Sequence, residues 1–241
     1  MGYDRALTPD TLIGISGSYS TASTDERGGN GEADIDLFQI IAYGAKSYGP
    51  INVSAQASYS FGDVEAERTA AVSSTVDETI TGEYDVDGFN IEGEASYQYD
   101  LDGNGYIAPL VGLRYGNFSS DEFTEDGGLN AIIGGNTTDL FEGRAGFITG
   151  NSYELSGAAL DVYAHAAYVY NFGGGVDDLD IIVGGESASL ERFEFDDQRV
   201  ELGLGANWNN EEGFTLGAQL DGEAGSSYTS IGGRLRAKFN F

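Results

Sequence analysis

The chain has 241 residues, of which 40 are Asp or Glu and 11 are Lys or Arg, so its formal net charge is −29 at pH 7. Its 15 Tyr, 13 Phe and 1 Trp argue against a disordered acidic chain, because such chains are poor in aromatic residues. The negative charge argues against nucleic acid as a partner, and no segment approaches the ~18 consecutive apolar residues of a membrane-spanning helix.

Apolar and polar residues alternate with a period of two along most of the chain, which is the pattern of a β-strand with two different faces. The clearest case is the segment 231–241, where Ile, Leu, Ala and Phe alternate with Arg, Lys and Asn. Most segments reach the ~9 to 11 residues that a tilted strand needs to cross a bilayer. The alternation predicts ten strands, at residues 11–20, 35–46, 51–61, 85–100, 105–117, 137–149, 157–172, 197–209, 214–223 and 229–241.

The connections between these segments alternate in length. The short ones are residues 47–50, 101–104, 151–156 and 210–213, and the long ones are residues 21–34, 62–84, 118–136 and 173–196. Only the last connection, 224–228, departs from this pattern. Short turns at one end and long loops at the other are typical of up-and-down barrels of the outer membrane. An even number of strands places both termini on the short-turn side and lets a ten-stranded barrel close without help.

Charged and aromatic residues are distributed as a membrane barrel requires. The four long connections contain 21 of the 40 acidic residues. Aromatic residues concentrate near both ends of the strands, as expected where rings settle at the two membrane surfaces. A charge on the lipid face costs ~2 to 4 kcal/mol at mid-depth, so charged strand residues are expected to face the lumen. The predicted lumen-facing set is Arg114, Glu142, Arg144, Arg199, Glu201, Asp221, Glu223, Arg234, Arg236 and Lys238.

Two candidate sites for chemistry have weak support. Asp100, Asp102 and Asn104 resemble the first half of a calcium loop, but Val111 stands where the loop needs a bidentate Glu. Asp-Gly and Asn-Gly are also common turn pairs, so a tight turn is favoured. His165, the only His, falls near mid-strand, which favours a hydrogen-bonding role in the lumen over catalysis. The chain has no Cys, phosphate loop or nucleophile elbow, so no enzymatic activity and no cofactor are predicted.

One long connection contains a possible hairpin. Residues 179–183 and 190–195 are apolar-rich and lie on either side of Gly184 and Gly185. Such a hairpin would rise from the membrane and either bind a partner or stiffen the loop. Stiffening of the loop is the favoured interpretation.

Several short motifs, taken in order, resemble the barrel domain that ends autotransporters, the self-secreting proteins of the outer membrane. They are GYDR at 2–5, PLVGLRY at 109–115, EGRAG at 142–146, ELGLG at 201–205, DGEAG at 221–225 and RLRAKFNF at 234–241. The resemblance implies a twelve-stranded barrel that holds a helix in its pore and passes an N-terminal passenger to the cell surface. Relative to that family, the chain is expected to lack the first two strands and the helix. Phe239 and Phe241 resemble the terminal signal that the barrel-assembly machinery recognises.

We therefore predict an all-β fold, a transmembrane up-and-down antiparallel barrel, with residues 1–241 as a single domain. The predicted function is to anchor in the outer membrane of a Gram-negative bacterium and to form a conduit for passenger secretion, with periplasmic termini and extracellular acidic loops. Expected partners are outer-membrane lipid and lipopolysaccharide, the barrel-assembly machinery and a passenger polypeptide. The alternative is a stand-alone small barrel, such as a porin, adhesin or structural surface protein, whose acidic loops are the functional part. A third possibility, an omptin-like hydrolase, requires His165.

Overall fold

The computed structural model describes residues 1–25, 31–73, 76–128, 130–174, 178–190, 196–210 and 212–239. All regular structure in these residues is β-structure. Among them, no helix is long and apolar enough to cross a membrane.

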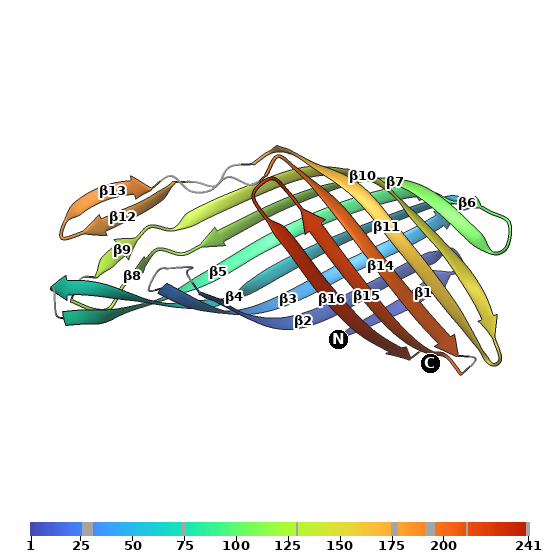
Figure 1. Cartoon of the computed structure of the whole chain (residues 1–241), viewed down its shortest axis with the longest axis horizontal. Coiled ribbons are helices and arrows are strands. Elements are labelled where there is room, and N and C mark those ends of the chain that lie inside the picture. The colour runs from blue at the N-terminus through green and yellow to red at the C-terminus, as the bar shows by residue number, and fades with distance from the viewer. Residues whose placement is uncertain are drawn as a thin grey trace.

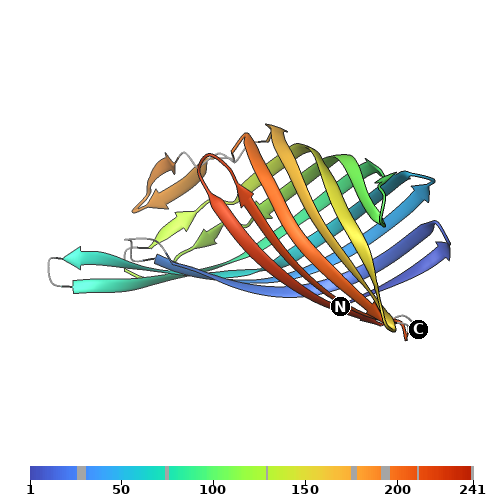
Figure 2. The ribbon, with the colours of Figure 1, turned by 45° about the vertical axis from the view of Figure 1, so that its right-hand side comes forward.

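A large antiparallel sheet forms the body of the molecule and curls into a barrel-like shape (Figure 1 and Figure 2). Strands that are consecutive in this sheet are also consecutive along the chain, so the topology is up-and-down. A short strand, β6, continues β5 beside β7. The strands are β1 (Gly2–Thr8), β2 (Thr11–Asp25), β3 (Gly31–Tyr48), β4 (Ile51–Ser73), β5 (Val76–Tyr97), β6 (Tyr99–Asp100), β7 (Gly105–Ser120), β10 (Asn136–Leu155), β11 (Ala158–Gly173), β14 (Gln198–Asn210), β15 (Phe214–Ala224) and β16 (Thr229–Phe239).

The predicted all-β, up-and-down antiparallel fold is confirmed, and each of the ten predicted strands is present. One further strand, β1, precedes them and pairs with β2. Several strands are also longer than predicted at the long-loop end. The largest difference is the connection 62–84, because β4 and β5 remain paired from Gly62 opposite Val86 to Ser73 opposite Val76. Strand-forming residues such as Val64 and Ile80 continue the pattern among the acidic residues that suggested a loop.

The sheet is not closed by backbone pairing between the described residues of β1 and β16. Ten antiparallel pairings separate these two strands, so they run in the same direction. The expectation that the strands of this chain close a barrel by themselves is therefore not met. The amino group of Met1 donates a hydrogen bond of 2.5 Å to the carbonyl oxygen of Gly17, partway along β2. The first residue consequently lies away from the short-turn end, where both termini were expected.

The convex face of the sheet is apolar. Large apolar side chains project from it, such as Leu204 and Leu220, which are 64% and 63% exposed. Aromatic rings gather near the short turns, where Tyr97 and Tyr99 have ring centroids 4.6 Å apart. They also gather toward the long loops, where the corresponding distance between Tyr19 and Phe38 is 4.9 Å. An apolar surface of this extent, with rings at both ends, suits lipid and is unfavourable in water.

Beyond the aromatic rings at the long-loop end, the convex face becomes acidic. Asp36, Asp63 and Asp85 lie directly opposite one another on β3, β4 and β5. The next row toward the long-loop end is Asp34, Glu65 and Glu83. Like charges directly opposite one another on adjacent strands are destabilising, so these two rows oppose folding of the hairpins that carry them.

A second, small sheet extends beyond the long-loop end of the barrel, at the left of Figure 1. Its strands are β8 (Phe123–Thr124), β9 (Ala131–Ile133), β12 (Leu179–Val183) and β13 (Glu186–Leu190), in the order β13-β12-β9-β8. The predicted hairpin around Gly184 and Gly185 is present as β12 and β13, although its second strand begins at Glu186 and residues 191–195 lie outside the described part.

Side-chain contacts fix the small sheet to the β4–β5 hairpin. Arg68 donates two hydrogen bonds of 2.6 Å to the carboxylate of Glu125, and these bonds hold the pKa of Glu125 below its usual value. The ring of Phe123 stacks on Tyr84 with centroids 4.6 Å apart. The predicted hairpin is therefore part of a sheet that joins two long connections and rests on a third.

Asp196 fastens the turn of the last hairpin to the beginning of β14. Its carboxylate accepts hydrogen bonds from the hydroxyls of Ser226 and Ser227, at 2.6 and 2.8 Å, and from the backbone N–H of Ser227 at 2.9 Å. The hydrogen bond from Ser226 is the largest of several that lower the pKa of Asp196 to about 2. All of them favour the charged form of the carboxyl group.

We predict that the stabilisation from these hydrogen bonds of Asp196 is lost in acid. Because the folded-state pKa of Asp196 lies below its ordinary 3.8, its stabilising contribution is present above that value and declines as the pH falls toward 2. The Asp196→Asn variant should unfold at lower urea than the parent protein at pH 7, and the two midpoints should converge between pH 4 and pH 2. Urea unfolding in detergent micelles, followed by fluorescence, measures both midpoints. A difference that is equally large at pH 7 and pH 2 would contradict the assignment.

Candidate functional site: the polar concave face

The concave face carries a network of charged side chains centred on Arg199. This residue, on β14, contacts Glu142 on β10 through two nitrogens, and it also lies 3.3 Å from Glu201 and 3.0 Å from Glu223. Glu142 is only 3% exposed. A carboxylate buried to this extent is expensive to desolvate unless it is paired. Arg199 therefore neutralises a charge that the fold has removed from water.

Arg144 and Arg114 extend the network toward β5. Arg144 lies 3.1 Å from Glu94 on β5 and 3.2 Å from Glu201 on β14. Arg114 lies 3.8 Å from Glu142 and donates a hydrogen bond of 2.8 Å to Asn90. The contacts therefore connect strands from β5 to β15 across the inside of the curl. Side chains two strands apart can meet in this way only on a concave face, where they converge.

Five contacts between described residues of this face join positions that are two strands apart and in register, and each passes over a glycine on the strand between. In each case the three residues lie directly opposite one another in the sheet. The rows, each with the distance between the side chains of its first and last residues, are Asp4–Gly14–Tyr43 (3.5 Å), Glu94–Gly112–Arg144 (3.1 Å), Tyr163–Gly205–Gln219 (2.9 Å), His165–Gly203–Asp221 (3.6 Å) and Asn207–Gly217–Arg236 (3.3 Å).

Four of these glycines, Gly14, Gly203, Gly205 and Gly217, lie so close to the contact above them that an added Cβ atom would be within 2.6 Å of another atom. Strands two positions apart are separated by roughly 9.6 Å, so their side chains must reach across the intervening backbone to touch. A Cβ atom added at Gly205 would lie 2.2 Å from the ring of Tyr163, and one added at Gly203 would lie 2.1 Å from the ring of His165. A side chain at either position would force the ring of Tyr163 or His165 to move. The inward glycines thus let contacts bridge the inside of the barrel.

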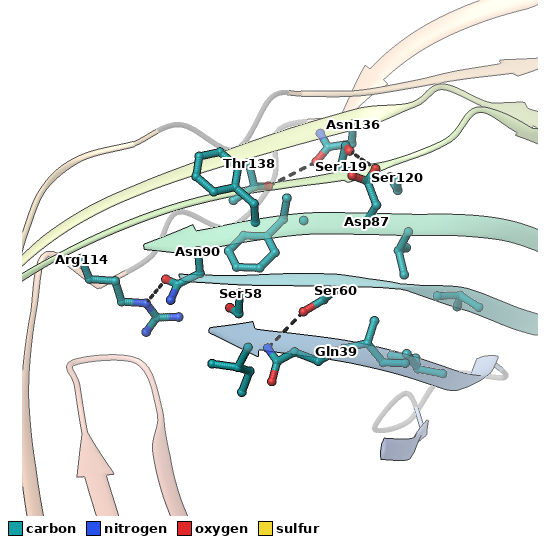
Figure 3. Close-up of a pocket in the computed structure, with 18 of the residues that line it drawn as sticks. Gln39, Ser58, Ser60, Asp87, Asn90, Arg114, Ser119, Ser120, Asn136 and Thr138 are labelled. Carbon is teal, nitrogen blue, oxygen red and sulfur yellow. Dashed lines mark hydrogen bonds between the residues drawn. The ribbon is translucent and has the colours of Figure 1, made fainter. Parts of the chain in front are cut away.

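A cavity of about 640 Å³ opens on the concave face toward the long-loop end (Figure 3). Its wall is mixed, with apolar residues such as Leu37 and Val64 beside hydrogen-bonded polar ones. Gln39 donates a hydrogen bond of 3.1 Å to Ser60, and Arg114, on β7, also lines the cavity (Figure 3). The inside of the curl is therefore hollow in this half and is not filled by side chains as a soluble core would be.

Most members of the predicted lumen-facing set contact another residue of this face. Besides the network around Arg199, Asp221 lies beside His165, Arg236 donates to Asn207, and Lys238 pairs with Asp4. Arg234 lines a cavity of about 480 Å³ together with His165 and Asp221. Participants outside that set include Asp4 and Tyr43. Asp4 was missed because residues 2–8 were not predicted as a strand. The sequence signal that could have indicated both residues is Gly14, an inward glycine that lies between Asp4 and Tyr43 across the sheet.

The remaining candidate residues lie elsewhere. Asp100 is the last residue of β6, and Asp102 and Asn104 lie in the turn that follows, where Gly103 and Asn104 have φ of 80° and 67°. Within the described ranges, no group of three or more His, Asp or Glu side chains has a geometry that could hold a metal ion. Phe239 lies on the convex face, with its ring centroid 4.8 Å from that of Phe214. Phe241 lies outside the described residues.

A family model described as the autotransporter beta-domain matches residues 1–221. The chain belongs to this family. Among curated proteins, outer membrane protein A of Rickettsia conorii is 22% identical over 255 residues, a match that covers 100% of this chain and 12% of that protein. The serine protease SepA autotransporter of Shigella flexneri is 26% identical over 155 residues, covering 61% of this chain and 11% of that protein. The chain thus spans about a tenth of the length of these relatives.

Two solved translocator structures share the fold. The translocator domain of the autotransporter NalP from Neisseria meningitidis superposes with a TM-score of 0.77, at 18% identity, over 100% of this chain and 77% of that one. The beta domain of the Bordetella autotransporter BrkA gives a TM-score of 0.69, also at 18% identity, over 100% of this chain and 88% of that one. This autotransporter beta-domain therefore has the architecture of both.

We predict that replacing its closely covered inward glycines destabilises the fold. Gly205→Ala should destabilise the protein by ~1 to 3 kcal/mol, because the new methyl group overlaps the ring of Tyr163. Gly17→Ala is the matched control, since its Cβ would be 3.7 Å from the nearest atom. Urea midpoints in micelles measure both changes. In a Tyr163→Ala background the cost of Gly205→Ala should shrink, and an unchanged cost would contradict the proposed overlap.

We also predict a large effect at Arg199. Arg199→Met leaves Glu142 buried with only Arg114 at 3.8 Å, and should cost roughly 3 kcal/mol of unfolding free energy. Adding Glu142→Gln should recover part of this loss, because the uncompensated charge is then gone. Arg236→Met is the control, as its partner Asn207 is neutral, and its cost should be about 1 kcal/mol. Equal losses at Arg199 and Arg236, measured by urea unfolding, would refute the argument.

Proposed function

We propose that this domain anchors its protein in the bacterial outer membrane and provides the conduit through which a passenger polypeptide reaches the cell surface. The observation that carries the proposal is the division of the sheet into an apolar convex face and a polar, partly hollow concave face. Membership of the autotransporter beta-domain family supports the same role. The mechanism needs no bond-making step, and no cofactor or enzymatic activity is proposed.

Anchoring rests on the convex face. Its side chains replace contacts with water by contacts with acyl chains, and the two groups of rings mark the membrane surfaces. The charges of the concave face are mostly paired with one another, so the inner wall is hydrophilic but offers few unpaired charges to a passing chain. An extended polypeptide could slide along such a wall without binding tightly to it.

The orientation follows from the charge. The acidic extensions and the small sheet lie at the end of the barrel that we place outside the cell, where they would meet lipopolysaccharide, and the short turns lie in the periplasm. Phe239, on the outer face of the last strand, together with Phe241, is proposed to be read by the barrel-assembly machinery.

The test is a surface-exposure assay on the full-length protein. An epitope tag is placed immediately before this domain, and intact Gram-negative cells are treated with external protease. We expect the tag to be cleaved in intact cells, because translocation carries it across the outer membrane. A variant that lacks residues 229–241 is the control, and its tag should stay protected.

The amount of folded barrel is measured in the same cells by heat-modifiable migration on gels. A protected tag together with a folded barrel in the outer-membrane fraction would mean that the domain anchors but does not translocate. That result would favour the stand-alone barrel instead.

A further inference from the structure

Two basic side chains stand on the convex face, near its short-turn end. Arg5 on β1 lies directly opposite Ile13, which is 47% exposed, and Lys46 on β3 lies directly opposite Val53, which is 41% exposed. Directly opposite residues point to the same face of a sheet, so both cations share the apolar outer surface. The other basic residues of the described part lie on the concave side or contact the small sheet.

Neither charge is neutralised by the protein. Within the described ranges, Arg5 makes no ion pair and no side-chain hydrogen bond. The Lys46 ammonium has no acidic partner there either, but it lies 4.9 Å from the centroid of the Tyr48 ring. An unpaired charge on the lipid face is costly at the middle of a bilayer and far less costly at its surface. Because Tyr48 is the last residue of β3, both cations belong at the membrane surface on the short-turn side.

The two cations are neighbours on this face. Arg5, Ile13 and Gly44 form one row across the sheet, and Thr11 and Lys46 form the next outward row toward the short turns. The spacings across and along the strands place the Cα atoms of Arg5 and Lys46 roughly 12 Å apart. Gly44 has no side chain to separate them, and a Cβ atom added there would lie 3.4 Å from its nearest neighbour. Two long cationic side chains can therefore converge on one anion.

We propose that Arg5 and Lys46 together bind the phosphate of one anionic phospholipid in the membrane leaflet at the short-turn end. A guanidinium group matches two oxygens of a phosphate, and an ammonium group adds a point charge. The hydroxyl of Thr11, directly opposite Lys46, is a further donor on the same face. The acyl chains would lie along apolar neighbours such as Ile13 and Val53. This inference rests on the proposed membrane anchoring, for which it names a bound lipid.

The charges of the convex face favour this end and an anionic headgroup. At the long-loop end, the acidic rows on β3, β4 and β5 repel a phosphate. At the short-turn end, no described carboxylate forms an ion pair with Arg5 or Lys46, so the pair keeps a charge of about +2 at neutral pH. A headgroup with a net negative charge satisfies this pair better than a zwitterionic headgroup does. Phosphatidylglycerol is therefore the expected class of ligand.

Native mass spectrometry of the purified protein tests the assignment. The protein in detergent micelles is given equal amounts of phosphatidylglycerol and phosphatidylcholine with the same acyl chains, and the lipid that remains bound after release from the micelle is identified by mass. The parent protein should retain one phosphatidylglycerol molecule with a preference of about tenfold or more, since each basic side chain near a membrane surface contributes roughly a fivefold factor. Equal retention of the two lipids would overturn the proposal.

Two double variants locate the site. Arg5→Gln/Lys46→Gln should retain the two lipids equally. Arg234→Gln/Arg236→Gln is the matched control, because it removes the same charge from the concave side, and it should keep the preference. Heat-modifiable migration on gels shows that each variant is folded. A preference that survives in the first variant, or that disappears equally in the control, would overturn the proposal.

Further variants test whether one phosphate is shared. Arg5→Lys/Lys46→Arg keeps both charges and should keep the preference, whereas Arg5→Gln and Lys46→Gln alone should each reduce it roughly fivefold. Two retained phosphatidylglycerol molecules, of which each single variant loses one, would mean two separate sites and would overturn the shared phosphate.

The lipid assay needs no passenger, so its outcome is separate from that of the surface-exposure assay. Loss of translocation with an intact lipid preference would overturn only the conduit. Absence of the protein from the outer-membrane fraction would overturn the anchor itself. A folded protein in that fraction without a lipid preference would overturn only the phosphate site.

Discussion

The need to pair every backbone N–H and C=O group inside hydrocarbon governs this molecule. A strand cannot satisfy these groups alone, so the chain folds as successive antiparallel neighbours, each completing the one before it. The same requirement explains why the sheet contains few internal breaks. In water an edge strand is tolerated when it is short or charged, whereas in lipid it has no solvent partner.

The apolar convex face then leaves only one place for charge within the membrane. Arginines and carboxylates collect on the concave face, where Arg199 and Arg144 each contact carboxylates from more than one strand. Inward glycines such as Gly112 and Gly203 let in-register contacts, such as Arg144–Glu94 and His165–Asp221, reach over a neighbouring strand. The curl of the sheet, the glycines and the paired charges therefore support one another. A barrel with bulky side chains at these positions would keep the same backbone but lose its internal cross-links.

Much of this architecture was predictable from the sequence, because lipid imposes a strict period of two on the strands. The segments 197–209 and 229–241 show it clearly, and they correspond to the strands β14 (Gln198–Asn210) and β16 (Thr229–Phe239). The segment 2–8 was missed because it is short and sits at an edge. The extensions of β4 and β5 were read as a loop because residues such as Asp63 and Glu65 suggested solvent. These residues do face solvent, but they do so from a hairpin. The rows over glycine depend on register between strands, which the period of a single strand does not encode.

The acidic rows on β3, β4 and β5 locate the outer limit of the lipid-facing band. Phe38 and Phe61 face one another across β3 and β4, and two residues beyond them stand Asp36 and Asp63. Opposed carboxylates cost roughly 0.2 to 1 kcal/mol per pair in water, but a single charge costs ~2 to 4 kcal/mol at the middle of a bilayer. The rows are therefore tolerable only where water and salt screen them. The side chain of Tyr19 spans the same boundary, since its ring lies against Phe38 while its hydroxyl donates a hydrogen bond of 2.7 Å to Asp36. The change from ring to carboxylate along one strand thus marks where acyl chains give way to headgroups.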